Sequence, residues 1–461
     1  MDNQNLNSFS QDLFNRKCIA ENLTKIIESK NKPMVISLDS DWGTGKTTFV
    51  TMWKDLLDND SNYNSKFNTL YFNAWEHDYI KDPLLAIFSE IEIQIKEDDP
   101  LLKQQFDKVK SKFSPYLKLG ATTIFKMLTR GALDLDKIDL GETNEDELIS
   151  LAEKLGDLAI QEVSASKNIR SELKKEMSKY QESSCKKIIF FIDELDRCRP
   201  SFAIELLEVI KHLFDIDNFI FIISIDKEQL SHSVSTIYGQ NMDTVGYLRR
   251  FFDLDYKLPK IDTKKYIDIK NSIIFKDYTN TGYLEVFLKE LFKIENFSLR
   301  DIDKAYYYIE LLLPLINEFN DHGTKFNTTY IMIISYIYSV LIMAKIKKPI
   351  IYKQIINSNY KLDEILNHFT TPNFLDYRNN IVNYHPEPLQ FIVNNLLKKY
   401  LEINLIVDSS KNLYDLNPEN FMVGLKEKDG SYVYNAKFSL LELFKEPRLN
   451  IQSKLEFIEG F

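Results

Sequence analysis

The stretch Ser40-Asp41-Trp42-Gly43-Thr44-Gly45-Lys46-Thr47 decides the fold of this chain. It follows residues 34–38, an apolar run with the composition of a buried strand, and it precedes residues 48–53, which favour a helix. A glycine-bearing turn between a strand and a helix directs several backbone N–H groups, and the positive end of the helix dipole, at one point. We therefore predict a phosphate-binding loop with room for a triphosphate.

The residues of this loop have distinct expected roles. Lys46 is expected to reach the β- and γ-phosphates, and the hydroxyl of Thr47 to bind Mg²⁺. Gly43 and Gly45 let the backbone approach the phosphates without a clash at Cβ. The usual pattern has glycine where this chain has Ser40, and a positive φ at a serine would cost about 1 kcal/mol. The predicted nucleotide-binding residues of the loop are Ser40, Asp41, Trp42, Gly43, Thr44, Gly45, Lys46, Thr47 and Thr48.

A second motif follows another apolar run, residues 186–192, which is typical of a strand covered on both faces. The run ends in Asp193-Glu194-Leu195-Asp196-Arg197. Acidic residues at the carboxyl end of a parallel strand lie where α/β sheets bind ligands. We expect Asp193 to hold Mg²⁺ through water, and Glu194 to orient and deprotonate an attacking water. The alternative is a cluster of charges that only caps the strand.

Two more strands are expected, at residues 69–73 and 218–224, and the helical segments between strands imply βαβ crossovers. Ser224 and Asp226 lie at the end of the second run. They either sense a γ-phosphate or cap a helix that begins near Lys227. The expected fold class is α/β, a P-loop parallel sheet sandwiched by helices.

Composition favours an intracellular protein of two or three domains, with 461 residues and 44% hydrophobic content. The net charge of −10 disfavours broad binding to nucleic acid. Three cysteines without metal-ligand spacing, and no signal sequence, predict a cytoplasmic location.

Residues 328–344 are apolar but short for a membrane span and contain interior tyrosines, so we expect a buried helix there. Packing is the expected role of the tryptophans Trp42, Trp53 and Trp75.

Several motifs together resemble the KAP family of P-loop NTPases, and they occur in family order between residue 12 and about residue 300. They are residues 41–47, Phe72-Asn73-Ala74-Trp75, the acidic block Asp193-Glu194-Leu195-Asp196-Arg197-Cys198, and Tyr247-Leu248-Arg249-Arg250-Phe251-Phe252 with Leu258-Pro259. The resemblance implies ATP hydrolysis coupled to conformational switching. Members are often encoded in bacterial and phage-related settings, and several are associated with exclusion of phage or defence against it. The departures are Ser40 and the lack of a transmembrane hairpin between the two nucleotide motifs.

Arginines are further candidates for the nucleotide site. Arg16 lies in a segment that resembles the one covering adenine in related NTPases, although a plain helix cap at Asn15 is the alternative. Arg300 follows a helix cap at Ser298, and in NTPases of this kind such an arginine reaches the nucleotide from a helical lid.

Arg249 and Arg250 are candidate catalytic arginines, beside Lys46 and Glu194, that would supply a finger to a neighbouring subunit. Their alternative role is to pair with nearby acids such as Asp253 and Asp255. Self-association, or an effector protein as partner, is therefore expected.

The expected domains are residues 1–260, an NTPase domain with a helical insertion at about residues 100–184, and residues 261–461, an all-α lid and carboxy-terminal domain. The predicted function is that of a Mg²⁺-dependent ATPase that acts as a conformational switch. The alternative is a scaffold that holds ATP with little turnover and recruits partner proteins. Glu194 argues against the scaffold, whereas Ser40 leaves room for it.

Overall fold

The computed structural model of the chain describes residues 8–80, 82–95, 100–117, 171, 174–180, 182–184, 186–213, 215–278, 281–317, 328–369, 396–405, 422–423 and 438–439. Residue contacts divide the chain into two compact units, residues 1–261 and residues 262–461. Each unit contains its own hydrophobic core.

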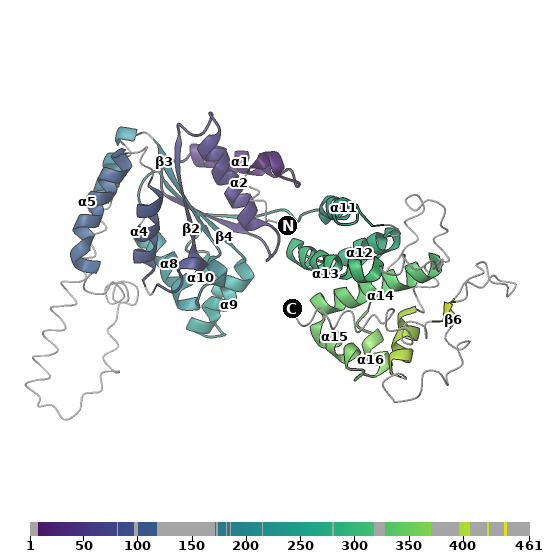
Figure 1. Cartoon of the computed structure of the whole chain (residues 1–461). Helices are drawn as coiled ribbons and strands as arrows, with labels where there is room; N and C mark the ends of the chain where they lie inside the picture. The colour runs from purple at the N-terminus through teal and green to yellow at the C-terminus, as the bar shows by residue number, and fades with distance from the viewer. Residues whose placement is uncertain are drawn as a thin grey trace, which may run out of the picture. The chain divides into compact units, whose positions relative to one another are not determined.

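A five-stranded parallel sheet forms the centre of the first unit (Figure 1). In spatial order its strands are β2 (Phe67–Asn73), β3 (Lys187–Asp193), β4 (Phe219–Ile225), β1 (Met34–Asp39) and β5 (Leu254–Lys257). Parallel neighbours need long crossover connections, and helices supply them here. Every residue of β4 is buried, which explains the unbroken apolar run in its sequence.

One face of the sheet is covered by α1 (Lys17–Glu28) and α2 (Lys46–Asn59) (Figure 1). Trp53 of α2 is fully buried, and its ring centroid lies 5.5 Å from that of Phe191 on β3. Its indole N–H donates to Thr24 Oγ1 of α1 at 2.9 Å, so the buried polar atom is satisfied. These contacts hold the first helix after the loop firmly against the sheet.

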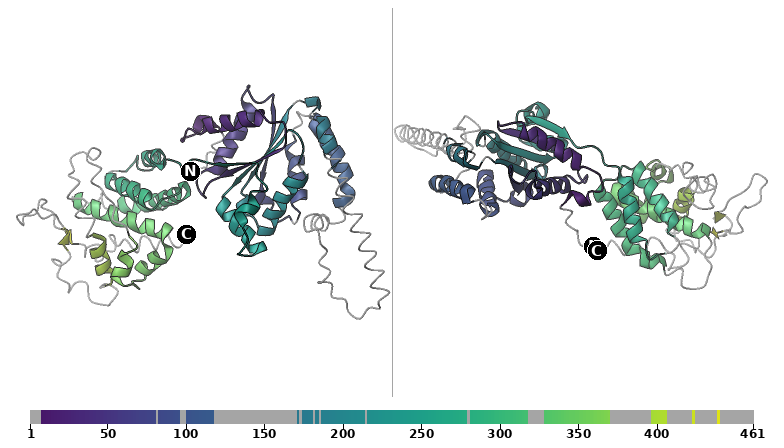
Figure 2. Two further views of the ribbon diagram at one scale, coloured as in Figure 1. Left: turned by 180° about the vertical axis from the view of Figure 1, so that it is seen from behind. Right: turned by 90° about the horizontal axis from the view of Figure 1, so that it is seen from above.

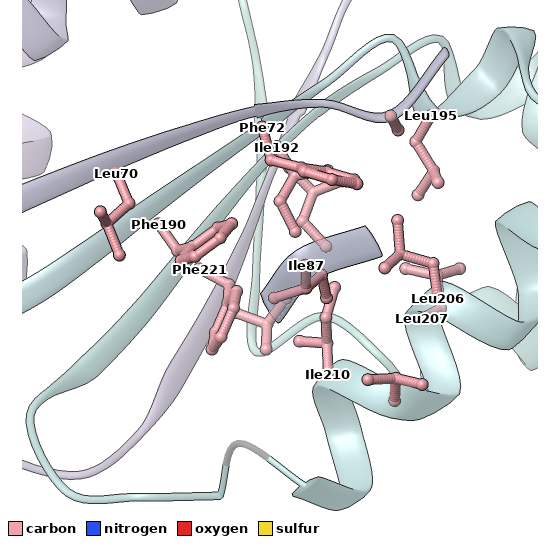
Figure 3. Close-up of a cluster of buried hydrophobic side chains, with 14 of the residues drawn as sticks. Leu70, Phe72, Ile87, Phe190, Ile192, Leu195, Leu206, Leu207, Ile210 and Phe221 are labelled. Carbon is pink, nitrogen blue, oxygen red and sulfur yellow. The ribbon is translucent and has the colours of Figure 1, made fainter. Parts of the chain in front are cut away.

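In the described part of the chain, five helices cover the opposite face of the sheet, and α10 (Thr244–Leu248) is the shortest of them. The others are α4 (Pro83–Gln94), α5 (Pro100–Leu117), α8 (Pro200–Leu213) and α9 (Lys227–Tyr238). Figure 3 shows part of this core, in which Phe190 and Phe221 from adjacent strands stack with ring centroids 5.5 Å apart and Ile87 and Leu206 reach in from α4 and α8. Three short elements complete the unit, namely η1 (Phe9–Gln11), α3 (Ala74–His77) and η3 (Leu195–Arg197).

The second unit is mainly helical (Figure 2). Its helices are α11 (Thr263–Ile274), α12 (Gly282–Ile294), α13 (Leu299–Asn317), α14 (Thr328–Lys347), α15 (Pro349–Ile356) and α16 (Leu362–Leu366), and residues 396–405 are also helical. Two short strands, β6 (Met422–Val423) and β7 (Phe438–Ser439), pair in antiparallel fashion. The hydrophobic core of this unit surrounds α14, which packs against α12, α13 and α15.

Helix α14 confirms the prediction of a buried helix, because residues 333–344 are all buried. A helix that is apolar all round belongs in a protein core when its neighbours cover every face. Among the described residues no helix is long and apolar enough to cross a membrane.

Two predicted helix caps have different outcomes. Ser298 caps α13 as expected, because its Oγ accepts the N–H of Asp301 at 3.2 Å and the Asp301 carboxylate accepts the N–H of Ser298 at 3.0 Å. The alternative reading of Asn15 as a helix cap is wrong, because α1 begins at Lys17 and Arg16 occupies the capping position. Most of the predicted insertion, residues 118–170, lies outside the described residues, and α5 forms its beginning.

Candidate functional site

The loop between β1 and α2 has the backbone conformation of a phosphate-binding turn. Gly43 and Gly45 have φ angles of 76° and 77°, values that favour glycine. Lys46 is the first residue of α2, so the free N–H groups of this helix face the loop. Ser40 is not among the described residues with positive φ, and its N–H donates to the carbonyl of Ile225 on β4 at 3.1 Å. Serine therefore fits this position without the backbone strain considered above.

Lys46 carries the main positive charge of the loop. Its ammonium group donates to the carbonyl oxygens of Ser40 and Asp41, the latter at 3.2 Å. Burial lowers the pKa of Lys46, and the charges of four carboxylates oppose this shift. These carboxylates belong to Asp196, Asp226, Asp193 and Asp39. Strands β1, β3 and β4 thus bring acidic residues around the lysine at the carboxyl edge of the sheet.

Asp193 and Glu194 lie at the end of β3, as the sequence predicts. The Asp193 carboxylate is buried, and it accepts the Tyr71 hydroxyl at 3.3 Å and the N–H of Glu194 at 2.9 Å. Burial and the charge of Asp193 raise the pKa of Tyr71, so that hydroxyl stays a donor. Glu194 has a φ of 59°, and its Oε1 forms an ion pair with Arg197 Nη1 at 2.7 Å.

Ser224 and Asp226 have separate environments at the end of β4. Asp226 caps α9, because its Oδ1 accepts the N–H of Gln229 at 3.2 Å. Ser224 pairs with Leu38 in the β1–β4 register and is completely buried. Its Oγ has no hydrogen-bond partner among the residues that the structure describes. A buried hydroxyl without a partner is uncommon in folded proteins, so Ser224 is a candidate to bind a ligand or a water.

Arg16 contacts the loop from the amino-terminal segment. Its Nη1 donates to the carbonyl of Gly45 at 3.1 Å, and its Nη2 lies 3.3 Å from Asp12 Oδ1. The guanidinium also faces the rings of Phe14 and Phe49, at 5.2 Å and 5.6 Å from their centroids. Burial lowers the pKa of Arg16, and Asp12 opposes the shift. The structure therefore brings Arg16 to the loop residue that precedes Lys46.

The two exposed tryptophans correct the expectation that all three serve packing. Trp53 is buried, but the side chains of Trp42 and Trp75 are 44% and 55% exposed. Trp42 donates its indole N–H to the carboxylate of Asp196. Trp75 lies beneath the guanidinium of Arg197, whose central carbon is 6.0 Å from the ring. Both tryptophans thus contact the turn that follows β3.

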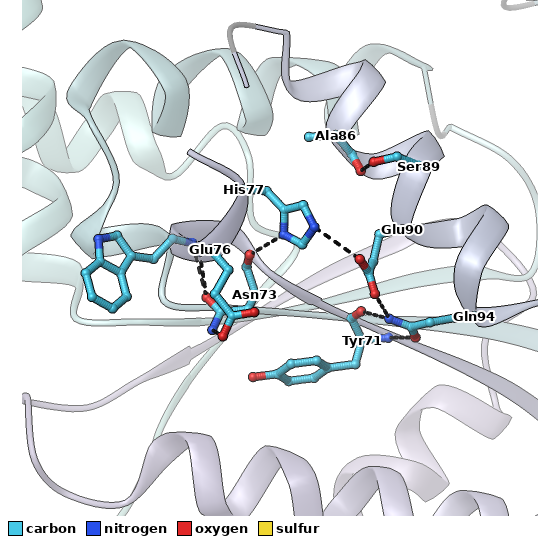
Figure 4. A network of polar contacts seen from close by, with 9 residues as sticks. Tyr71, Asn73, Glu76, His77, Ala86, Ser89, Glu90 and Gln94 are labelled. Carbon is cyan, nitrogen blue, oxygen red and sulfur yellow. Dashed lines mark hydrogen bonds and ion pairs between the residues drawn. The ribbon is translucent and has the colours of Figure 1, made fainter. Parts of the chain in front are cut away.

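A polar network fixes the end of β2 (Figure 4). Asn73 accepts two backbone N–H groups of α3 and donates to Glu76 Oε1 at 2.8 Å. His77 Nδ1 lies 2.9 Å from the carbonyl oxygen of Asn73, and its Nε2 lies 3.1 Å from Glu90 Oε2. Glu90 in turn accepts from Gln94 at 2.5 Å. The network ties α3 to α4 and so holds the segment that carries Trp75.

Among the described residues of the first unit, no hydrogen bond or ion pair joins Arg249 or Arg250 to the phosphate loop. Arg249 and Arg250 directly follow α10 and are exposed. The alternative pairing with Asp253 and Asp255 is found only in part: Asp253 accepts the N–H of Val35 at 2.9 Å, whereas the charge of Arg249 is one of the causes that lower the pKa of Asp255. Asp255 accepts from Ser37 Oγ at 2.6 Å and from Lys227 Nζ at 2.7 Å. Arg300 is the second residue of α13, in the other unit.

Sequence reasoning missed Tyr71 and Arg197 as members of the site. Tyr71 is two residues before the end of β2, on the face that carries Asp193, so strand alternation was a usable signal. Arg197 belongs to the acidic block but contacts Glu194 only because the block forms a tight turn. No cluster of three or more His, Cys, Asp or Glu side chains in the described part could hold a metal ion.

The parallel sheet, the glycine-bearing loop between β1 and α2, and the acidic end of β3 define a P-loop NTPase domain. The model of the KAP family P-loop domain matches residues 16–313, so the chain belongs to this family.

Comparison with known proteins adds remote relatives. The uncharacterised protein MJ0182 of Methanocaldococcus jannaschii is 30% identical over 175 residues, covering 33% of this chain and 87% of that protein. Domain III of the Thermotoga maritima replication initiation protein DnaA is 12% identical, covering 75% of this chain and 99% of that chain, with a TM-score of 0.30. The Aeropyrum pernix ORC2 protein is 10% identical, covering 89% and 99%, with a TM-score of 0.35. At these scores the structural likeness identifies no function.

Proposed function

We propose that this chain is a Mg²⁺-dependent ATP hydrolase. The observation that carries the proposal is the setting of Lys46, a half-buried cation at the start of α2 with carboxylates of three strands around it. Burial lowers the pKa of Lys46, so its positive charge is favoured by anions nearby. A polyphosphate beside the ammonium group would supply compensating negative charge, so the site favours such a ligand.

Each step of hydrolysis has a residue of suitable chemistry. Lys46 and the N–H groups of the loop would bind the phosphates, and Arg16 would keep the loop in shape through Gly45. Glu194 would accept the proton of the attacking water. The unpaired hydroxyl of Ser224 would bind the γ-phosphate or that water. The remaining loop residues, Ser40, Asp41, Trp42, Thr44 and Thr48, would shape the pocket.

The oxygen atoms of Thr47 and Asp193 fit a magnesium site. Mg²⁺ is commonly held by one or two protein oxygens together with substrate phosphates and water, so an all-protein cage is not needed. Thr47 is exposed at the helix start, and Asp193 is fixed by Tyr71 and by the N–H of Glu194. Bound Mg²⁺ would neutralise charge on the phosphate oxygens.

The wider proposal is that hydrolysis changes the arrangement of the two units, with Arg300 contacting nucleotide from the helical unit. We further propose that the chain acts with copies of itself or with an effector protein, in the cytoplasm, in defence against phage or exclusion of phage. The family resemblance supports this setting. Distance measurements between labelled units with and without ATP test the switch, and phage challenge of cells carrying wild-type protein or Lys46→Ala tests the setting.

The hydrolase proposal is tested with two variants that fail in different ways. Lys46→Ala should weaken ATP binding by about 10- to 100-fold, the value of a charged hydrogen bond. Glu194→Gln should bind ATP normally but hydrolyse it at least about 100-fold more slowly, because the amide cannot accept the proton. ATP affinity and single-turnover hydrolysis are measured for both.

Lys54→Ala is the matched control. Lys54 lies on the same helix as Lys46, but it forms an ion pair with Asp58, at 2.6 Å, rather than with the loop. The variant should keep both ATP affinity and turnover. Tight ATP binding with equal, negligible turnover in wild type and Glu194→Gln would instead support the scaffold that recruits partner proteins.

A further inference from the structure

The turn after β3 brings a cation to the proposed general base. Glu194 directly precedes the 3₁₀ turn η3 and Arg197 is its last residue, and the N–H of Arg197 donates to the carbonyl of Glu194 at 3.2 Å. Their side chains form an ion pair at 2.7 Å, with 14% of the Glu194 side chain and 27% of the Arg197 side chain exposed. A planar guanidinium restricts the carboxylate more than an ammonium would, because its N–H groups have fixed directions.

A second element orients the guanidinium. The Arg197 side chain lies over the ring of Trp75, 6.0 Å from the centroid, which is within the range of a cation–π contact. Trp75 is held in turn by Asn73, whose Oδ1 accepts the N–H of Trp75 at 3.1 Å. Asn73, at the end of β2, thus holds Trp75, and the Trp75 ring supports the Arg197 side chain. Arg197 in turn holds the Glu194 carboxylate.

We propose that Arg197 is a positioning residue for Glu194 and that Trp75 supports it. This inference rests on the proposed hydrolysis, in which Glu194 accepts a proton from water. By holding Oε1, the guanidinium sets the rotation of the carboxylate and so the direction in which Oε2 faces. A general base must lie within hydrogen-bond reach of its proton, and a small misplacement of a catalytic group is costly.

The local geometry favours positioning over inhibition. An inhibitory partner must be able to leave the base, which is easiest when it lies on a separate element that can move. Arg197 is three residues from Glu194 in the same short turn and is joined to it by a backbone hydrogen bond. The cation therefore moves together with the base.

The test measures kcat and KM for ATP in the full chain. Arg197→Ala should lower kcat by about 10- to 100-fold with KM changed less than about twofold, because the phosphate loop is untouched. Arg197→Lys should recover part of the loss, since it keeps the charge but not the planar donors. Trp75→Ala should lower kcat by about 2- to 5-fold, a milder change that tests the same chain of contacts if Arg197→Ala folds poorly.

Two comparisons separate positioning from a structural effect. Arg199→Ala is the matched control, because Arg199 is two residues away and pairs with Asp78 at 2.6 Å. It should keep wild-type kcat. In the Glu194→Gln background, Arg197→Ala should cause no further loss of turnover, because the group that it positions is already disabled.

Outcomes for the two proposals are distinguishable. If wild type does not turn over ATP, the proposed hydrolysis fails. If wild type and Glu194→Gln turn it over equally, Glu194 is not the general base; in either case the positioning role of Arg197 fails as well. If these two differ while Arg197→Ala and Trp75→Ala keep wild-type kcat, only the positioning role is wrong. A rise of kcat in Arg197→Ala would also overturn it, since the arginine would then restrain the base.

Discussion

Trp42 donates its indole N–H to the carboxylate of Asp196, and this bond joins the phosphate loop to the turn after β3. The two residues are 154 positions apart in the chain. Asp196 is buried, which raises its pKa, while the Trp42 N–H and the charge of Lys46 oppose the shift. The two halves of the nucleotide site are thus linked by a direct bond as well as through the sheet.

Loss of the Trp42 bond should destabilise the first unit. Trp42→Phe leaves the buried Asp196 carboxylate without this donor, so the free energy of unfolding should fall by about 1–2 kcal/mol. Urea unfolding of the full chain measures the change. Trp75→Phe removes the same indole group from another exposed tryptophan and should change the value by less than about 0.5 kcal/mol. Equal losses in the two variants would mean that the bond to Asp196 is not the cause.

Removal of the Ser224 hydroxyl should lower ATP turnover without lowering the stability of the chain. Ser224→Ala removes a buried polar atom that lacks a partner in the described residues, so stability should stay the same or rise by about 1 kcal/mol. Turnover of ATP should fall, because the hydroxyl would bind the γ-phosphate or the water.

Ser37→Ala supplies the contrast for Ser224. Ser37 is also fully buried, but its hydroxyl donates to Asp255 at 2.6 Å. Its removal should lower stability by about 1 kcal/mol with turnover retained. If Ser224→Ala destabilises the chain as Ser37→Ala does and leaves turnover intact, Ser224 has only a structural role.

Arg16 should matter for stability before nucleotide is added. Its pair with Asp12 is buried, so Arg16→Ala leaves this carboxylate with the backbone N–H groups of Phe14 and Arg16 but without its cation, and it should cost about 3 kcal/mol. Thermal or urea unfolding without nucleotide measures this loss. Lys17→Ala, next in the chain, breaks only an exposed pair with Glu21 at 3.7 Å and should cost less than about 0.5 kcal/mol. A small effect for Arg16→Ala would show that Asp12 finds another partner.

Arg249 and Arg250 should act in a neighbouring subunit if they act in catalysis at all. Both are exposed, and in the described residues Asp253 bonds Val35 while Asp255 forms its ion pair with Lys227. Specific activity should therefore rise with protein concentration, by up to several orders of magnitude for a finger supplied in trans. Mixing Lys46→Ala with the Arg249→Ala, Arg250→Ala double variant should restore activity that each lacks alone. Flat specific activity and no recovery on mixing would exclude the finger.

Acid should weaken the second unit through Asp301. Burial alone would raise the pKa of this carboxyl, but hydrogen bonds from Lys347 and Ser298 hold it below its ordinary value. A lowered folded pKa contributes stability that is present above about pH 4 and is lost as pH falls through the folded value. Asp301→Asn should therefore lower the urea midpoint at pH 7, with a stability loss of about 1 kcal/mol, and the loss should be smaller at pH 3, since protonation removes the same charge as pH falls through the folded pKa.

Glu364→Gln is the control for Asp301, because Glu364 forms only an exposed pair with Lys361 at 3.2 Å. Its urea midpoint should follow that of wild type at both pH values. An Asp301→Asn loss that is the same at pH 7 and at pH 3 would mean that the charge of Asp301 contributes nothing.

Much of the chain could be predicted from local sequence, because local chemistry decides it. The apolar runs became β1, β3 and β4, and the phosphate loop lies between β1 and α2 as expected. Ser298 caps its helix through bonds to a residue three positions away. The burial of α14 follows from its apolar composition alone. Such features depend on neighbours in sequence, which the sequence displays directly.

The sequence by itself therefore determined the family, the class of fold and the loop that carries Lys46. Tertiary structure decided which side chains meet, because the order β2-β3-β4-β1-β5 places strands together that are far apart in the chain. Only this order brings Tyr71 to Asp193, surrounds Lys46 with acids from three strands, and buries Ser224 without a partner among the residues that the structure describes. Pairing between strands depends on the packing of the whole core, and no local pattern encodes it.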